Sequence, residues 1–294
     1  MEYRKFWLIN ALGRRYDFTD LTTNTSFLNN PTGLGFQRTF TSLIVGNSEL
    51  VTSQQFRLTD IQGELMFYDG KTGDKYQQYQ DFIQFAKFKP LELHYQTPND
   101  LKSYYCDVIF VQIDKTEVKQ NGILSAPVIF HRLTEWLNDE DYSIILFNSP
   151  VDEGKYHDLI YNYHYAGTTL QNTPINNNGT DDVGFVIEIN GEVQNPQFTI
   201  TQRGEQYGIC KINGTYDYVM LDSIERTESM YLERNGSAIT NPEQYQDFTI
   251  RNGASYLTWC KFRVGESIFN FTCGNIETFD GYVSIRFKNS YATV

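Results

Sequence analysis

Two clusters of acidic residues are the side chains whose type and spacing could support hydrolytic chemistry. Asp139, Glu140 and Asp141 follow one another, and Asp152 and Glu153 form a second group. Glycoside hydrolysis requires two carboxyl groups that flank the scissile bond. Both clusters fall in stretches that we predict to be linkers, whereas a cleft would need such groups on neighbouring strands. We therefore interpret them as solvated linker charge and expect no catalytic residue.

The histidines and a short Gly-Lys-Thr triplet are the remaining candidates for cofactor chemistry. His157 and His164 lie seven residues apart, with no Cys or carboxylate at the spacing of a zinc-ligand pair. The triplet at residues 70–72 resembles the end of a phosphate-binding loop, but Leu65 stands where that loop requires its first glycine. We expect neither a metal nor a nucleotide cofactor.

The cysteines and the apolar runs indicate where the chain is made. Four cysteines are far apart and form no C-x-x-C spacing, which predicts buried free thiols in a reducing cytosol: Cys106, Cys210, Cys260 and Cys273. The N-terminus lacks the apolar core of a signal peptide, and no apolar run reaches the length of a membrane span. We expect a soluble chain without a cleaved signal and without a membrane partner.

Composition and charge narrow the class of protein further. Aromatic residues make up 15% of the 294 residues, with 21 Tyr and 21 Phe, which favours strands over helices. The formal net charge of −12 argues against a sequence-reading nucleic-acid partner, because such a partner needs a basic stripe. The same charge argues against an anionic membrane surface. The composition predicts a mainly β protein.

Residues 74–95 carry the clearest local pattern. Asp74 followed by Gln77 is typical of a helix start, where the carboxylate accepts from free backbone N–H groups. Apolar side chains at helical spacing follow on one face, namely Tyr76, Tyr79, Phe82, Ile83 and Ala86. Pro90 ends the helix. Alternation of Leu91, Leu93 and Tyr95 with polar residues then predicts a half-buried strand.

Residues 43–51 predict a hairpin that turns at Gly46-Asn47. Both of its arms are apolar: Leu43, Ile44 and Val45 on one side, Leu50 and Val51 on the other. An apolar hairpin tip with open edges is a surface that a monomer avoids. We therefore predict that these residues contact a neighbouring subunit. The alternative is an ordinary hairpin in the core.

The second half of the chain shows a regular sequence of turns. A polar break at residues 137–141 closes the first half, and residues 168–182, rich in Asn, Thr and Gly, predict a loop. Asn-Gly pairs then separate alternating apolar runs and predict antiparallel hairpins, at Asn190-Gly191, Asn213-Gly214, Asn235-Gly236 and Asn252-Gly253. This spacing is typical of a β-sandwich.

Aromatic residues in the predicted sandwich could contact sugar. A sugar ring stacks on an aromatic side chain that lies beside polar groups, and Tyr256 or Trp259 could provide such a contact. In a predicted strand, however, Trp259 also fits the core. A structural role is therefore preferred to sugar binding.

Several segments together resemble the distal tail protein family of siphophages. They include the helix and strand at residues 74–97, the opening at residues 4–10 and the segment at residues 30–36. A further segment matches residue by residue, at Lys115, Thr116, Glu117, Asn121, Gly122, Ile129, Phe130, Thr134 and Trp136. The second half keeps two family features, Asn195-Pro196 after a Gly turn and a closing pattern at Val283, Ile285, Phe287 and Tyr291. The resemblance covers nearly the whole chain.

The resemblance implies a structural protein, not an enzyme, that forms a homohexameric ring at the phage tail tip. It implies a β-sandwich-like ring domain with one helix at residues 1–138, a linker with connecting strands at 139–182, and a galectin-like β-sandwich at 183–294. The ring would contact the tail tube protein, the tail-associated hub protein and receptor-binding proteins. DNA would only pass through its channel, whose wall would carry part of the negative charge. Assembly would occur in the host cytoplasm and the product would lie in the virion.

Two other functions remain open from the residues alone. The second half could be a carbohydrate-binding module that contacts cell-wall glycan directly. The chain could also be a wall-degrading glycosidase, although no pair of carboxylates is predicted to face a cleft.

Overall fold

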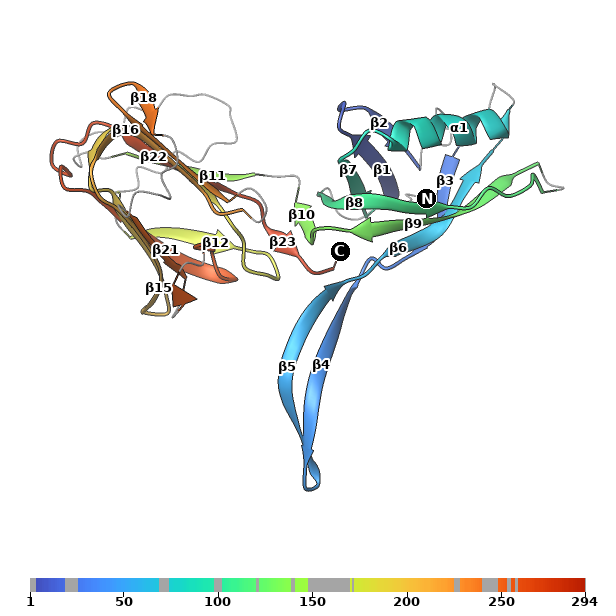
Figure 1. The fold of residues 1–294 in the computed structure, drawn as a ribbon, viewed down its shortest axis with the longest axis horizontal. Helices are drawn as coiled ribbons and strands as arrows, with labels where there is room; N and C mark the ends of the chain where they lie inside the picture. The colour runs from blue at the N-terminus through green and yellow to red at the C-terminus, as the bar shows by residue number, and fades with distance from the viewer. Residues whose placement is uncertain are drawn as a thin grey trace. The chain divides into compact units, whose positions relative to one another are not determined.

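A computed structural model divides the chain into two compact units (Figure 1). One unit holds residues 1–139 and 291–294, and the other holds residues 140–290. The structure describes residues 4–18, 26–68, 74–97, 102–119, 122–138, 141–147, 170, 172–224, 228–239, 248–252, 255–256 and 259–293. The predicted mainly β fold is confirmed, as is the helix before the strand at residues 91–96.

The first unit is built on one large antiparallel sheet. Its strand order is β2-β1-β7-β8-β9-β6-β3, and β10 pairs with β8 and β23. The strands are β1 (Lys5–Asn10), β2 (Arg15–Asp17), β3 (Ser26–Thr32), β6 (Ile61–Phe67), β7 (Leu91–Gln96), β8 (Ser103–Ile113), β9 (Leu124–Arg132), β10 (Trp136–Asn138) and β23 (Ser290–Tyr291). Leu8, Leu93 and Cys106 are paired across three of these strands, so their side chains share the buried face.

Helix α1 (Lys75–Ala86) packs on that buried face of the sheet. The Asp74 carboxylate accepts hydrogen bonds from the backbone N–H groups of Tyr76 and Gln77, so the predicted cap is confirmed. Phe82 is fully buried and lies at the centre of an aromatic cluster, with ring centroids 5.2 Å from Tyr16 and 5.7 Å from Phe110. This one face of the helix therefore ties together strands that are far apart in the sequence.

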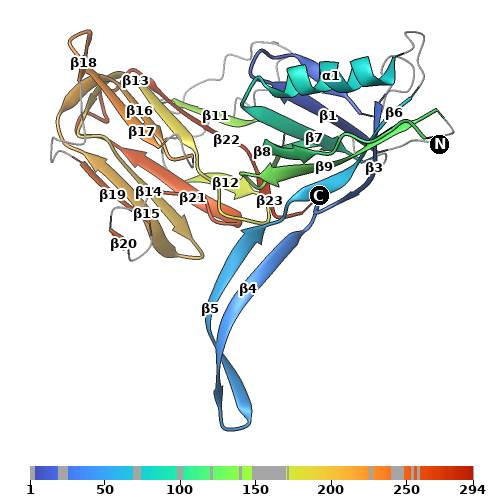
Figure 2. The ribbon, with the colours of Figure 1, turned by 45° about the vertical axis from the view of Figure 1, so that its right-hand side comes forward.

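Strands β4 (Phe36–Val45) and β5 (Ser48–Leu58) form a separate two-stranded sheet. Both figures show this hairpin extending away from the large sheet of its own unit (Figures 1 and 2). The predicted hairpin at residues 43–51 is confirmed as a hairpin, and it is longer than the sequence pattern indicated.

Over the residues described in it, the second unit is a sandwich of two six-stranded antiparallel sheets (Figure 2). One sheet has the order β11-β22-β13-β16-β17-β18, with β11 (Tyr142–Phe147), β13 (Val186–Gln194), β16 (Thr215–Asp222), β17 (Ser229–Arg234), β18 (Ser237–Ile239) and β22 (Tyr282–Phe287). The other has the order β12-β21-β14-β15-β19-β20, with β12 (Thr173–Asn177), β14 (Gln197–Gln202), β15 (Glu205–Ile212), β19 (Phe248–Asn252), β20 (Ser255–Tyr256) and β21 (Gly265–Thr272). A core rich in Phe fills the space between the inner faces.

The Asn-Gly pairs do not all make hairpin turns. Asn235 and Gly236 both have positive φ and form the two-residue turn between β17 and β18, as predicted. The prediction was wrong at Asn190-Gly191, which lies inside β13 at a register shift, and at Asn213-Gly214, which joins strands of different sheets. Gly253 lies outside the described residues. An Asn-Gly pair fits any site that needs positive φ, so bulges and crossovers accept it too.

The loop predicted at residues 168–182 was wrong at its centre. Residues 173–177 form β12, which pairs with β21. Thr173, Ile175 and Asn177 alternate inward, and the buried Asn177 amide donates to the backbone oxygens of Asp181 and Phe262. The polar composition predicted a loop, but these polar side chains can be buried in a strand because they are hydrogen-bonded there. β11 and β12 both lie in the stretch assigned to a linker and connecting strands, and each pairs with a strand of the sandwich.

The four cysteines are buried and free, as predicted. Burial raises the pKa of Cys106 to about 12, although the nearby Arg132 guanidinium acts in the opposite direction. Burial likewise raises the pKa of Cys210 and Cys273. These thiols stay protonated at neutral pH and are therefore poor nucleophiles and poor metal ligands.

Truncating the central aromatic side chain should destabilise the first unit. We expect Phe82→Ala to lower the free energy of unfolding by about 3–5 kcal/mol, because it leaves a cavity under the helix. Equilibrium unfolding in urea measures this. Gln80→Ala, on the exposed side of the same helix, is the control and should change it by less than about 0.5 kcal/mol. Equal effects of the two variants would contradict the packing described.

The raised thiol pKa predicts a loss of stability in alkaline solution. The folded chain holds the Cys106 proton to higher pH than the unfolded chain does, so its contribution is complete below the ordinary thiol value of 9.0 and declines as pH rises toward about 12. We expect the urea midpoint to fall between pH 8.5 and pH 11, and to fall less steeply in Cys106→Ala. An identical slope in that variant would contradict the assignment.

Candidate functional site

The β4–β5 hairpin is the most unusual surface of the described chain. Its strands pair from Phe36 opposite Leu58 to Val45 opposite Ser48, with one register shift where Thr52 bulges out. Gly46 has a φ of +64°, which glycine adopts without steric cost, and Gly46-Asn47 is the two-residue turn at the tip. The backbone geometry is that of an ordinary hairpin, so its unusual property lies in the side chains.

Large apolar side chains of the hairpin are exposed along both strands. Ile44 is 80% exposed and Phe40 is 63% exposed, and the others are Phe36, Leu43, Val45, Leu50 and Val51. None of the described side chains of the hairpin belongs to either hydrophobic core. The five residues predicted as a subunit contact, Leu43, Ile44, Val45, Leu50 and Val51, are thus brought together at the tip, and their contact with a neighbour stays a prediction.

The hairpin leaves the large sheet through a base that admits only glycine at one position. Gly33 has a φ of +82°, and a Cβ atom there would lie 1.9 Å from the backbone oxygen of Asp60. The Thr59 hydroxyl donates to the backbone oxygens of Gly33 and Gly35, at 2.7 Å and 3.0 Å. The segment that leads into β4 is therefore hydrogen-bonded to the residue that follows β5, at the point where the hairpin leaves the sheet.

Two side chains from the large sheet hold the same base. The Trp136 indole N–H donates to the backbone oxygen of Leu34 at 3.1 Å, and the Arg132 guanidinium donates to that of Gly35 at 3.1 Å. Arg132 is 1% exposed and lies 5.2 Å from the Trp136 ring, and burial lowers the pKa of its guanidinium. We call Gly33, Leu34, Gly35, Thr59, Arg132 and Trp136 the hairpin base. It sets the direction in which the hairpin leaves the sheet.

The familial motif residues lie at structural positions in the first unit. Trp136, at the end of the motif, reaches the segment 30–36, so two segments noted separately in the sequence meet at the hairpin base. Glu117 accepts a hydrogen bond of 2.7 Å from the hydroxyl of Tyr76 on α1, and Lys115 lies over the same ring. The Thr134 hydroxyl accepts from the backbone N–H of Asp107 at 2.9 Å. Each of these contacts ties a connecting segment to a helix or a strand.

The residues considered for catalysis or metal binding do not gather. Among the described residues, no group of three His, Cys, Asp or Glu side chains could hold a metal ion. His94 stacks between Trp7 and Tyr105, and His131 pairs with Asp60 at 2.7 Å. Asp141 pairs with Lys288 at 3.6 Å. His157, His164, the triplet at 70–72 and the acidic residues 139, 140, 152 and 153 lie outside the described residues.

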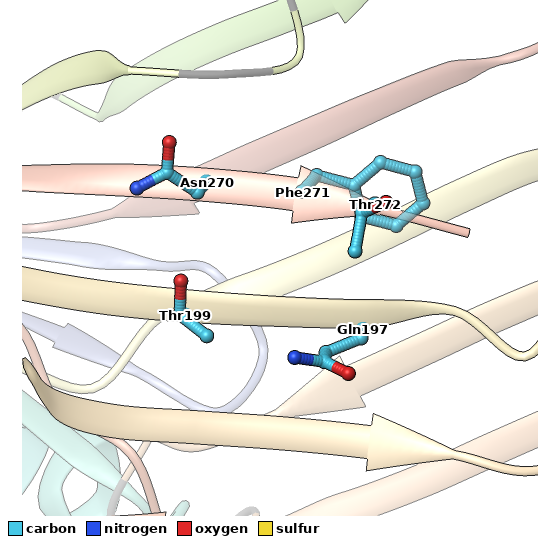
Figure 3. Close-up of a pocket in the computed structure, with 5 residues that line it drawn as sticks. All are labelled: Gln197, Thr199, Asn270, Phe271 and Thr272. Carbon is cyan, nitrogen blue, oxygen red and sulfur yellow. The ribbon is translucent and has the colours of Figure 1, made fainter. Parts of the chain in front are cut away.

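A shallow pocket of about 340 Å³ lies on the second sheet of the sandwich (Figure 3). Gln197 and Thr199 of β14 and Asn270 and Thr272 of β21 face one another across paired strands, and Phe271 also lines it. Trp259 does not line this pocket; it packs, partly buried, against the sandwich core. The side chain of Tyr256 lies outside the described residues, so its sugar contact stays a prediction.

Among the described residues, no helix is long and apolar enough to cross a membrane.

The sequence pattern limited the apolar hairpin to residues 43–51, so Phe36, Phe40 and the hairpin base were not predicted as part of this surface. Phe36 and Phe40 precede the predicted tip and, like Ile44, lie at even positions of one strand, so the three side chains share a face. That shared face was a usable signal in the sequence. Arg132 carried no signal, because a buried guanidinium looks like any surface Arg until the fold places it.

A family model matches part of this chain, and solved structures resemble its fold. Residues 5–133 match the family described as the distal tail protein, N-terminal domain. A chain of the phage P2 baseplate in its activated conformation with calcium is 15% identical, with a TM-score of 0.56 and 99% of each chain covered. The Dit protein of phage SPP1, described as a paradigm of the hub adsorption apparatus in phages that infect Gram-positive bacteria, is 9% identical. Its TM-score is 0.63, with 97% of this chain and 98% of that chain covered. No curated protein matches.

Proposed function

We propose an architectural role for this chain, which belongs to the distal tail protein family and is a structural component of the phage tail tip. Six copies close into a homohexameric ring. The ring joins the tail tube protein on one side to the tail-associated hub protein on the other, and it carries the receptor-binding proteins. Its action is positional, because it converts the symmetry of the tube into a platform.

The exposed apolar hairpin is the observation that supports ring closure. Leu43, Ile44, Val45, Leu50 and Val51 would gain stability only by leaving water, and no core of their own unit covers them. Each such apolar side chain contributes about 1.5–3 kcal/mol when it becomes fully buried. A hairpin that reaches from each copy to the next makes a head-to-tail contact, and head-to-tail contacts close into rings when the rotation permits.

The two units take different parts in this proposal. Residues 1–138 form the ring, because the hairpin and its base both lie there. Residues 183–294, together with β11 and β12 from the connecting stretch 139–182, form a galectin-like sandwich that docks the receptor-binding proteins. Assembly occurs in the host cytoplasm.

The net charge of the chain fits a passage for DNA. Each copy carries −12, and a channel wall that shares this charge repels the phosphate backbone. DNA therefore passes through without binding. No residue is required to make or break a bond.

Removing the hairpin tip should abolish assembly. We replace residues 43–51 by Asn-Gly, so that Ser42 and Thr52 flank a short turn. Light scattering coupled to size-exclusion chromatography measures the particle mass. The full-length chain should have the mass of an oligomer. The variant should have the mass of one chain, slightly below the 34.2 kDa of the full-length chain.

The fold of the variant provides the control. Its circular dichroism should match that of the full-length chain, and it should still unfold cooperatively in urea, because the described hairpin side chains belong to neither core. An unchanged oligomeric mass in a folded variant would overturn the role given to the hairpin.

The pocket on the sandwich supports a second candidate, a carbohydrate-binding module. Its amide and hydroxyl groups, on Gln197, Thr199, Asn270 and Thr272, could bind sugar hydroxyls. A glycan array probed with the full-length chain tests this. The architectural account predicts no retained glycan. Retention that is lost in Thr199→Val and kept in Thr201→Val, further along the same strand, would favour the module.

A further inference from the structure

The two faces of the β4–β5 hairpin differ in composition. Side chains at directly paired positions share a face, and alternate positions along a strand return to it. One face carries large apolar side chains from the base to the tip, and we call it the apolar face: Phe36, Phe40, Ile44, Val51 and Leu58. All of these except Leu58 are more than 45% exposed. Apolar groups thus run the full length of one side.

The opposite face is polar along the stem and apolar only at the tip. Gln37, Thr39, Thr41, Ser53 and Arg57 occupy the stem on this side. Beyond the bulge the same face carries Leu43 opposite Leu50, and then Val45. The stem of the hairpin therefore carries apolar side chains on one face only, whereas the tip carries them on both faces.

This distribution restricts how the hairpin can be covered. A hairpin that is inserted along its whole length would bury the polar stem face, where each unsatisfied polar group costs about 1–3 kcal/mol. A hairpin in water on both sides would leave the apolar face uncovered, and an isolated two-stranded hairpin is at best marginally stable. Only a flat contact along the stem, with the tip enclosed on both sides, satisfies both faces.

The charged side chains of the hairpin indicate the kind of partner. Arg38 and Arg57 against Glu49 give the hairpin a net charge of +1, whereas the whole chain carries −12. Glu49 lies on the apolar face and accepts a hydrogen bond from the Ser42 hydroxyl within the hairpin. Arg38 is on the apolar face as well, and its guanidinium lies 5.5 Å from the Phe36 ring. Arg38 and Glu49 cancel in net charge on the apolar face, and Arg57 lies on the other side, so along its stem this face is an apolar surface with the Arg38 guanidinium as its charge, which matches a partner that offers a carboxylate at that point.

We propose that the hairpin lies with its apolar face flat on a second copy of this chain, its stem backed by water and its tip enclosed. A second copy is acidic, and it is present wherever the chain assembles. The Arg38 guanidinium then faces a carboxylate of that copy, and the polar stem face stays outside the contact. This inference rests on the proposed ring and specifies which side of the hairpin forms it.

Two neighbouring substitutions test the orientation. Phe40→Asp places a carboxylate on the apolar face, and Thr41→Asp places the same group one residue away on the polar face. Assembly is followed by the concentration dependence of particle mass. We expect Phe40→Asp to weaken association by about 30-fold or more, as for a central contact residue. We expect Thr41→Asp to change it by less than about 3-fold.

The two arginines of the stem provide a second matched pair. Arg38 is on the apolar face, and Arg57, paired with Gln37, is on the polar face. Arg38→Ala should weaken association by about 10-fold, in a manner that diminishes with added salt, and Arg57→Ala should leave it unchanged. Equal effects of the two would contradict a carboxylate opposite Arg38.

The outcomes separate this proposal from the ring itself. Equal loss of assembly in Phe40→Asp and Thr41→Asp, with both variants folded, would overturn the one-sided contact and leave the ring standing. If neither variant loses assembly, while removal of residues 43–51 still gives monomers, the contact is restricted to the tip. That result would also overturn the proposed contact along the stem. A full-length chain that stays monomeric would overturn both, and binding of this hairpin only to another tail protein would then replace the second copy.

Discussion

An apolar β-hairpin that its own unit leaves uncovered is the constraint on which the rest of this structure depends. Side chains such as Phe40 and Ile44 lie more than 60% exposed on strands that no other described strand pairs. Burial of apolar surface is the main favourable term in folding and in association alike. The proposed ring would cover this surface and would therefore add to the stability of the folded chain.

The first unit is organised to present that hairpin in a fixed direction. Arg132 and Trp136 donate hydrogen bonds to the backbone oxygens of Gly35 and Leu34, and the close approach at Gly33 leaves no room for a side chain. A fixed base lowers the entropy that binding costs, since fewer orientations of the hairpin must be lost. The aromatic cluster around Phe82 packs helix α1 on the same sheet from which the hairpin leaves.

The sequence allowed some of this to be predicted because certain patterns have a single physical solution. Asp74 with the helical spacing that follows it predicted α1 and its cap, and Gly46-Asn47 between apolar arms predicted the hairpin. Other elements depended on tertiary context. β12 was hidden because Asn177 is buried with its amide hydrogen-bonded, and Asn213-Gly214 crosses between sheets although it has the composition of a hairpin turn. The hairpin base could not be predicted, because Arg132 and Gly35 are 97 residues apart and meet only in the folded unit.

Electron microscopy of the purified full-length chain tests the central claim most directly. Copies that cover one another's hairpins should form particles with six-fold symmetry around an open centre, each built from six chains of 34.2 kDa. Single compact particles of one chain at every concentration examined, including samples mixed with the tail tube protein, would contradict the account.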